Sequence, residues 1–166
     1  MQSISWKRVI ADEEIHRHID PGSNGAIAMI AEDGTIEIYS LFDDMLLMLC
    51  RDWSFDDCIC AVEDVSSSPQ MGVKSAFSFG KGFGFIQGVL RSNGIPFALV
   101  KPAKWKAEFG CNLGKQYTTK QKKDKDIEVC KRLFPNVSLK RTPKCRTDDD
   151  GFADSLMLAC FAKRRL

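Results

Sequence analysis

The stretch that decides the fold is Cys58-Ile59-Cys60-Ala61-Val62-Glu63. A short unbroken apolar run of this kind is typical of a strand buried on both faces of a sheet. The run ends on a glutamate, and the carboxyl ends of strands are where α/β sheets carry their ligand sites. We therefore predict a central strand over 58–62 that delivers Glu63 to a functional site.

Further strands are predicted on both sides of this run. They cover Ile15–Ile19, Ala26–Ile30, Thr35–Tyr39 and Ile95–Val100. Asp33-Gly34 is a hairpin signal, so the three strands nearest the N-terminus are expected to form an antiparallel meander. The first of them is expected to lie parallel to the central strand.

Helices are expected between and after these strands. They cover Phe42–Trp53, Val73–Asn93, Ala103–Phe109, Thr119–Leu133 and Asp149–Lys163. A meander followed by alternating strands and helices predicts the α/β class, with a mixed five-stranded sheet flanked by helices. We expect one domain over 1–166, in which 1–14 form a loosely packed extension.

Composition favours one soluble core. The chain has 166 residues, 44% of them hydrophobic, and no run approaches the roughly 18 apolar residues of a membrane helix. No signal peptide is visible, so a cytoplasmic location is expected, in the host cytosol if the protein is phage-encoded; an organelle is the less favoured alternative. The seven cysteines form no CxxC pair, which favours buried free thiols over disulfides or zinc.

Charge is distributed unevenly along the chain. Residues 12–64 hold 14 acids and 2 bases, whereas residues 101–146 hold 14 bases and 4 acids. The basic half favours a polyanionic partner, with an affinity that falls as salt rises. The acidic half is compatible with nucleic acid if some of its carboxylates hold metal ions.

Four carboxylates are the candidate site. Asp20 enters a glycine turn after the first strand, Glu63 ends the central strand, and Asp150 and Asp154 begin the last helix. Residues four apart share a helix face, so the last two can point at one place. Carboxylate oxygens suit Mg²⁺ or Mn²⁺, and two such ions catalyse phosphodiester hydrolysis. The alternative for Asp148, Asp149 and Asp150 is a capping role.

Several segments, taken in order, resemble the RuvC-type Holliday junction resolvases of the ribonuclease H-like fold, in particular the phage-encoded and organellar members. The matching segments are Ile19–Ala26 (IDPGSNGA), Ala61–Glu63 (AVE), Phe79–Gly84 (FGKGFG) with Gly88, Lys101–Lys106 (KPAKWK), Leu133–Pro135 (LFP) and Asp149–Ser155 (DDGFADS). The resemblance covers roughly residues 15–162.

This resemblance implies a homodimeric, Mg²⁺-dependent endonuclease that nicks four-way DNA junctions in pairs, without a membrane or a small-molecule cofactor. It makes Asp20, Glu63, Asp150 and Asp154 the ligands of two metal ions. Many members carry the last pair three residues apart, so Asp149 is an alternative to Asp150. The family's first strand is usually apolar, whereas this one contains His16 and His18.

Basic residues complete the predicted site. Lys106 is the candidate that stabilises charge on the phosphate in the transition state. Candidate DNA contacts are Lys81, Lys104, Lys120, Lys122, Lys123, Lys125 and Phe77, the last by stacking on a base. Gly80, Gly84 and Gly88 form a smooth helix face, for which packing in the core or in a dimer is one interpretation and lining of the junction the other.

Three other functions fit part of the pattern. One is a less specific nuclease acting on flaps or on RNA–DNA hybrids. Another is a junction-binding protein without catalysis, against which the presence of all four acids argues. A fragment of an actin-like sugar kinase would share the glycine turn, but the chain is too short for the two lobes of that fold.

Overall fold

The computed structural model describes residues 15–19, 25–41, 46–48, 50, 58–67 and 71–166. Side chains of 15–19, Cys58 and Ile59 lie outside this description. Within the described part, the α/β class is confirmed, with strands and helices in the predicted order.

A five-stranded mixed sheet forms the centre, in the order β3-β2-β1-β4-β5. Its strands are β1 (Ile15–Ile19), β2 (Ala26–Ile30), β3 (Ile36–Ser40), β4 (Cys58–Glu63) and β5 (Phe97–Val100). The meander prediction is confirmed, because β1–β2 and β2–β3 pair antiparallel. So is the parallel pairing of β1 with β4, in which Ile19 lies opposite Val62.

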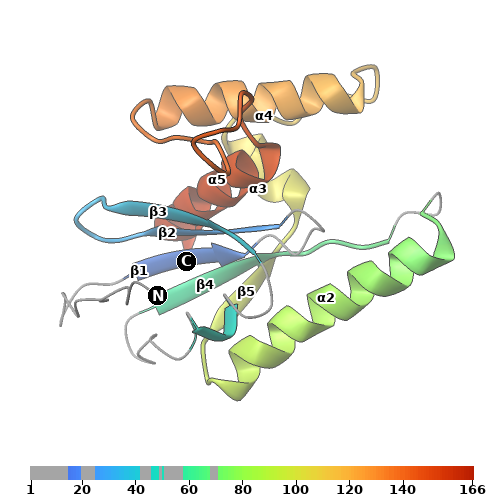
Figure 1. Ribbon diagram of the computed structural model, residues 1–166, viewed down its shortest axis with the longest axis vertical. Coiled ribbons are helices and arrows are strands. Elements are labelled where there is room, and N and C mark those ends of the chain that lie inside the picture. Colours follow the sequence, from blue (N-terminus) through green and yellow to red (C-terminus); the bar gives the residue numbers. More distant parts are fainter. Residues whose placement is uncertain (1–14, 20–24, 42–45, 49, 51–57, 68–70) are drawn as a thin grey trace.

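Helices cover both faces of the sheet (Figure 1). Helix α2 (Val73–Ser92) lies on one face, and α5 (Asp150–Arg165) packs on the other, between the sheet and α4 (Thr119–Leu133). The short helix α3 (Pro102–Glu108) follows β5. Residues 46–48 and 50 are helical, and the rest of the predicted helix 42–53 lies outside the described residues.

Alternation along the strands separates the core into two parts. Ala26, Ala28 and Ala61 pack with α3, α4 and α5, whereas Ile27 and Val62 pack with the C-terminal half of α2. Since successive strand residues point to opposite faces, one strand can serve both layers. Cys60, Cys111 and Cys130 are among the buried thiols, as predicted, and none of the described cysteines is bonded to another.

The glycine face of α2 is exposed. A Cβ atom built on Gly80, Gly84 or Gly88 would meet no other atom of the described chain within 4 Å. Within the described residues this face does not pack in the core, because α2 turns its opposite side, with Ile86, Val89 and Leu90, to the sheet. Near the start of the same helix, Val73 and Phe77 are 86% and 75% exposed.

No helix in the described residues is both long enough and apolar enough to cross a membrane.

Candidate active site

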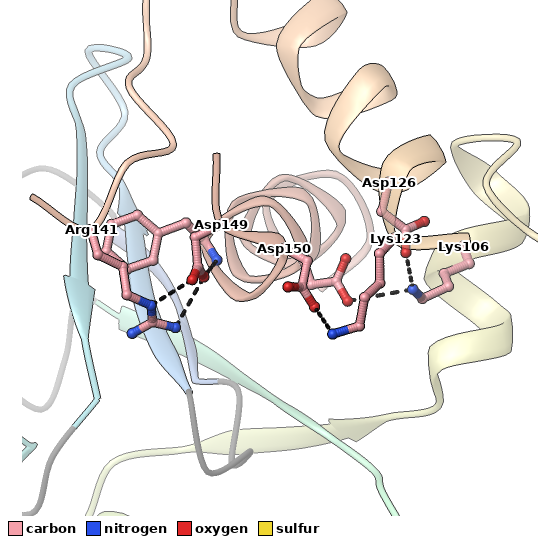
Figure 2. A network of polar contacts seen from close by, with 8 residues as sticks. Lys106, Lys123, Asp126, Arg141, Asp149 and Asp150 are labelled. Carbon is pink, nitrogen blue, oxygen red and sulfur yellow. Dashed lines mark hydrogen bonds and ion pairs between the residues drawn. The ribbon is translucent and has the colours of Figure 1, made fainter. Parts of the chain in front are cut away.

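The acidic residues at the start of α5 lie on two sides of the helix. Asp149 is the N-cap, and one of its carboxylate oxygens accepts a hydrogen bond from the backbone N–H of Phe152 at 3.1 Å. Asp150 is the first helical residue, and Asp154 follows four residues later on the same face. Figure 2 shows Asp149 on one side of the helix start and Asp150 on the other.

Asp149 is held by Arg141, away from the other carboxylates. The guanidinium Nε and Nη2 donate to its two oxygens at 2.6 and 3.0 Å. The same guanidinium donates to the Ser40 hydroxyl at 3.1 Å, so it ties the loop before α5 to the end of β3. Bidentate pairing of this kind is among the stronger polar contacts in proteins. Asp149 therefore serves as a structural link in this conformation.

Asp150 faces helix α4. Its carboxylate pairs with the ammonium of Lys123 at 2.6 Å (Figure 2). This hydrogen bond is the main reason why the pKa of Lys123 is raised, and it outweighs the opposing effect of partial burial. Both side chains are accessible to solvent, 52% for Lys123 and 38% for Asp150. A ligand approaching this end of α5 would meet both charges.

Lys106 is the centre of the deeper part of the site. Its ammonium lies 2.5 Å from a carboxylate oxygen of Asp126 and 3.4 Å from one of Asp154. Burial lowers the pKa of Lys106, but the negative charges of Asp154, Asp126 and Glu63 together raise it above its usual value. Lys106 is therefore a charged lysine among three carboxylates that come from different elements.

Glu63 reaches the same place from the end of β4. The indole N–H of Trp105 donates to its Oε1 at 3.1 Å, and Trp105 is fully buried. Trp105 and Lys106 are neighbours on α3, and the lysine ammonium lies 4.7 Å from the indole centroid. One short helix thus orients Glu63 and also supplies the cation beside it.

These contacts bring together most of the predicted residues. Glu63, Asp154 and Lys106 share one site, and Asp150 lies on the Asp154 face of α5. Asp20 lies outside the described residues, as do the side chains of His16 and His18. Ile19, which precedes Asp20 in the sequence, pairs with the residue before Glu63.

The donor set suits a hard divalent cation. Within the described ranges, no group of three or more acidic, histidine or cysteine side chains is placed to hold a metal ion. Asp154 nevertheless lies 3.4 Å from the Lys106 ammonium, and the negative charge of Glu63 helps to raise the pKa of the same lysine. Carboxylate oxygens that gather around one positive charge have the chemistry that Mg²⁺ and Mn²⁺ require.

The candidate DNA contacts lie on three helices. Lys120 and Lys123 are three residues apart on α4 and therefore share a face. Lys125 makes an ion pair with Glu128 at 3.0 Å, while Lys122 is partly exposed. The remaining candidates are exposed residues on α3 and α2, namely Lys104, Lys81 and Phe77.

Sequence reasoning missed Asp126, Trp105 and Arg141. Asp126 is 2% exposed on a helix with more bases than acids, three and four residues before the buried Val129 and Cys130. An acid at a core position of an amphipathic helix is a readable signal of a buried ion pair. The partners of Trp105 and Arg141 are 42 and 8 residues away in sequence, and no local pattern identifies them.

Comparisons with known proteins identify the fold. No family model and no curated protein sequence matches this chain. Among solved structures, T. thermophilus RuvC in complex with a Holliday junction substrate matches with a TM-score of 0.57 at 15% identity, over 90% of this chain and 95% of that one. A second Thermus thermophilus RuvC structure matches with a TM-score of 0.54 at 16% identity, over 90% and 96%. The chain therefore has an α/β fold similar to that of RuvC.

Proposed function

We propose that this chain is a metal-dependent endonuclease that hydrolyses phosphodiester bonds in branched DNA, with the four-way junction as its preferred substrate. The observation that carries the proposal is that α3 contacts both acids: Trp105 donates to Glu63 at 3.1 Å, and the ammonium of its neighbour Lys106 lies 3.4 Å from Asp154. The fold is similar to that of a protein solved with a Holliday junction substrate, which supports this choice of DNA. Such an enzyme would work in the cytoplasm of a cell or of a phage host.

Each residue of the site has a proposed role. Glu63, Asp150 and Asp154, together with Asp20, hold two divalent ions, Mg²⁺ or Mn²⁺. Such ions, when bound, lower the pKa of water and stabilise the leaving oxygen of the phosphodiester. Lys106 supplies a fixed positive charge for the negative charge that builds up on the phosphate. Asp149 is assigned to the helix cap rather than to the metal, since Arg141 holds both of its oxygens.

DNA is proposed to reach the site along α4. Lys120, Lys122, Lys123 and Lys125 neutralise phosphates next to the cleaved bond, and Lys104 and Lys81 extend the contact. Phe77, 75% exposed near the start of α2, stacks on a base at the branch. Contacts to phosphates carry no sequence information, so selectivity would come from the shape of the DNA.

A cleavage assay on a synthetic mobile four-way junction, with and without EDTA, tests this function. We expect paired nicks that need the metal, and a loss of about 10²-fold or more in rate for Asp154→Asn or Glu63→Gln. Asp20→Asn should abolish cleavage and keep junction binding. Asp124→Asn, an exposed acid on α4, is the matched control and should cleave normally. Normal cleavage by Asp154→Asn would refute the proposed site.

The same assay separates the alternatives. Faster cleavage of a flap or of an RNA–DNA hybrid than of the junction would favour a less specific nuclease of the ribonuclease H type. Tight junction binding without metal-dependent cleavage would favour a non-catalytic binding protein. Each substrate should carry the same arm sequences, so that only the shape of the nucleic acid differs.

A homodimer is part of the proposal, with the glycine face of α2 as its interface. Two sites related by a two-fold axis could cut opposed strands of one junction. Gly84→Leu has room within the described chain, because nothing lies within 4 Å of a Cβ atom there. We therefore expect the variant to sediment as a monomer with an unchanged melting temperature. A Gly84→Leu dimer as tight as the wild type would place the interface elsewhere.

A further inference from the structure

Helix α4 contains one buried acidic residue, Asp126. Asp126 is 2% exposed, whereas the other acids of the helix, Asp124 and Glu128, are exposed. Burying a carboxylate is unfavourable unless it is paired and hydrogen-bonded. Val129 and Cys130, on the same side of the helix, belong to the apolar core. An apolar residue at 126 would suit this packing, so the aspartate calls for a reason beyond the fold.

The partner of Asp126 is a residue of the site. The ammonium of Lys106 donates to Asp126 at 2.5 Å and to Asp154 at 3.4 Å, so Asp126 is the closer of the two acids. Lysine is a point charge on a flexible four-carbon chain, and its position is therefore set by the groups that bind it. Of these two groups, the Asp126 side chain is buried at 3% exposure, whereas the Asp154 side chain is 24% exposed.

We propose that Asp126 is a positioning residue, which anchors the ammonium of Lys106 from the interior and keeps it beside Asp154 and Glu63 without binding substrate itself. This inference rests on the proposed function, in which Asp154 holds a divalent cation. An anchored lysine can give up its contact with Asp154 to the metal ion and still stay in the site. Without Asp126, the ammonium would move toward Asp154 and compete with the metal ion for its oxygens.

Asp126→Asn tests the anchor, because the amide keeps the shape of the side chain and removes its charge. We expect the kcat for junction cleavage to fall by about 10- to 100-fold, with KM and junction binding unchanged, as for residues that orient a metal site from its second layer of contacts. Mn²⁺ titrated into the DNA-free protein by calorimetry should bind several-fold more weakly. Asp124→Asn, the same change at an exposed position of α4, should alter neither quantity.

Nuclear magnetic resonance can detect a change in the surroundings of the Lys106 ammonium in the absence of metal and DNA. In protein labelled with ¹⁵N-lysine, the ammonium signal of Lys106, assigned by its loss in Lys106→Met, should shift in Asp126→Asn and stay in place in Asp124→Asn. In the double variant Asp126→Asn/Lys106→Met, Mn²⁺ affinity should equal that of Lys106→Met alone, because no lysine is left to compete.

Several results would overturn the inference. One is an unchanged Lys106 signal in Asp126→Asn, and another is a loss of Mn²⁺ affinity that persists in the double variant. If Asp126→Asn does not fold, Asp126→Ser, which is smaller and still polar, is read by the same ammonium signal. If the wild type cleaves no junction, the proposed function fails, while the resonance and calorimetry still decide whether Asp126 anchors Lys106.

Discussion

Replacing Asp149 with alanine should destabilise the protein and leave its chemistry intact. The side chain makes three contacts: it caps α5 through the N–H of Phe152, and it accepts two hydrogen bonds from Arg141. Asp150, the next residue, makes a solvent-accessible ion pair with Lys123. The two acids are adjacent in sequence, but we expect the loss of Asp149 to lower stability and the loss of Asp150 to lower the rate of cleavage.

The magnitude follows from these contacts. Loss of an N-cap costs about 1 kcal/mol. Hydrogen bonds between charged groups contribute about 1.5–3 kcal/mol, and we take the lower end because both side chains are 23% exposed. The free energy of unfolding should therefore fall by about 2.5 kcal/mol for Asp149→Ala. For a chain of this size, the melting temperature should drop by roughly 5–10 °C.

Urea unfolding followed by circular dichroism measures the free energy of unfolding of Asp149→Ala. Junction cleavage below its melting temperature measures whether the chemistry is intact. Asp148→Ala is the matched control: its carboxylate pairs with Lys131, which is 58% exposed, so its loss should cost less than about 1 kcal/mol. Asp150→Ala should reduce cleavage and change stability by a similarly small amount. If Asp149→Ala unfolds like Asp148→Ala and also loses metal binding, our assignment of Asp149 to the cap is wrong.

Three further predictions follow from the site and its surroundings. Trp105→Phe keeps an aromatic ring but removes the N–H donor to Glu63. The kcat for cleavage should therefore fall about tenfold, and the free energy of unfolding should fall by about 1–2 kcal/mol. An unchanged kcat would show that the hydrogen bond does not orient Glu63. Lys123→Gln should make the dependence of log junction affinity on log salt shallower by about one, measured by fluorescence anisotropy, if the lysine neutralises one phosphate. Burial raises the pKa of Cys130 from 9.0 to about 12 and that of Cys111 to about 11. Thiols of the unfolded chain lose their protons near pH 9, whereas these two keep theirs in the folded protein. Their contribution to the free energy of unfolding is therefore fully present below pH 9 and is lost as pH rises toward 12. The free energy of unfolding in urea should be lower at pH 10.5 than at pH 8. The difference between the two pH values should be smaller in Cys130→Ala than in the wild type.

Most of the fold could be read from patterns of apolar residues. Strands β1 and β2 and helix α4 have the predicted bounds, because alternation and capping residues are local signals. Strand β5 is shorter than predicted, at Phe97–Val100 rather than Ile95–Val100. The N–H of Ile95 bonds back to the carbonyl of Leu90 at the end of α2, and Pro96 has no N–H to give to a ladder.

The site was predictable only in part. Glu63 and Asp150 could be proposed because strand ends and helix starts are readable in a sequence, and Asp154 because it follows Asp150 by about one helical turn. Lys106 could be proposed from the family resemblance. Our proposal of Asp150 over Asp149 as a ligand rests on the N-cap of α5 and on the pairing of Asp149 with Arg141, and the contacts of Arg141 are tertiary. Asp126 pairs with a residue 20 positions earlier on another helix, so its partner appears only when the helices are packed.

Helix α5 has a consequence for how the protein is made. It buries nine of its residues, contacts the strands β1 to β4, and carries two of the proposed metal ligands. A chain emerging from the ribosome therefore lacks one layer of its core, and two of the four proposed metal ligands, until α5 has been synthesised and has packed on the sheet. The proposed nuclease would therefore be inactive before α5 has packed. Under the proposed function, the packing of α5 would complete the core and the metal site in one step.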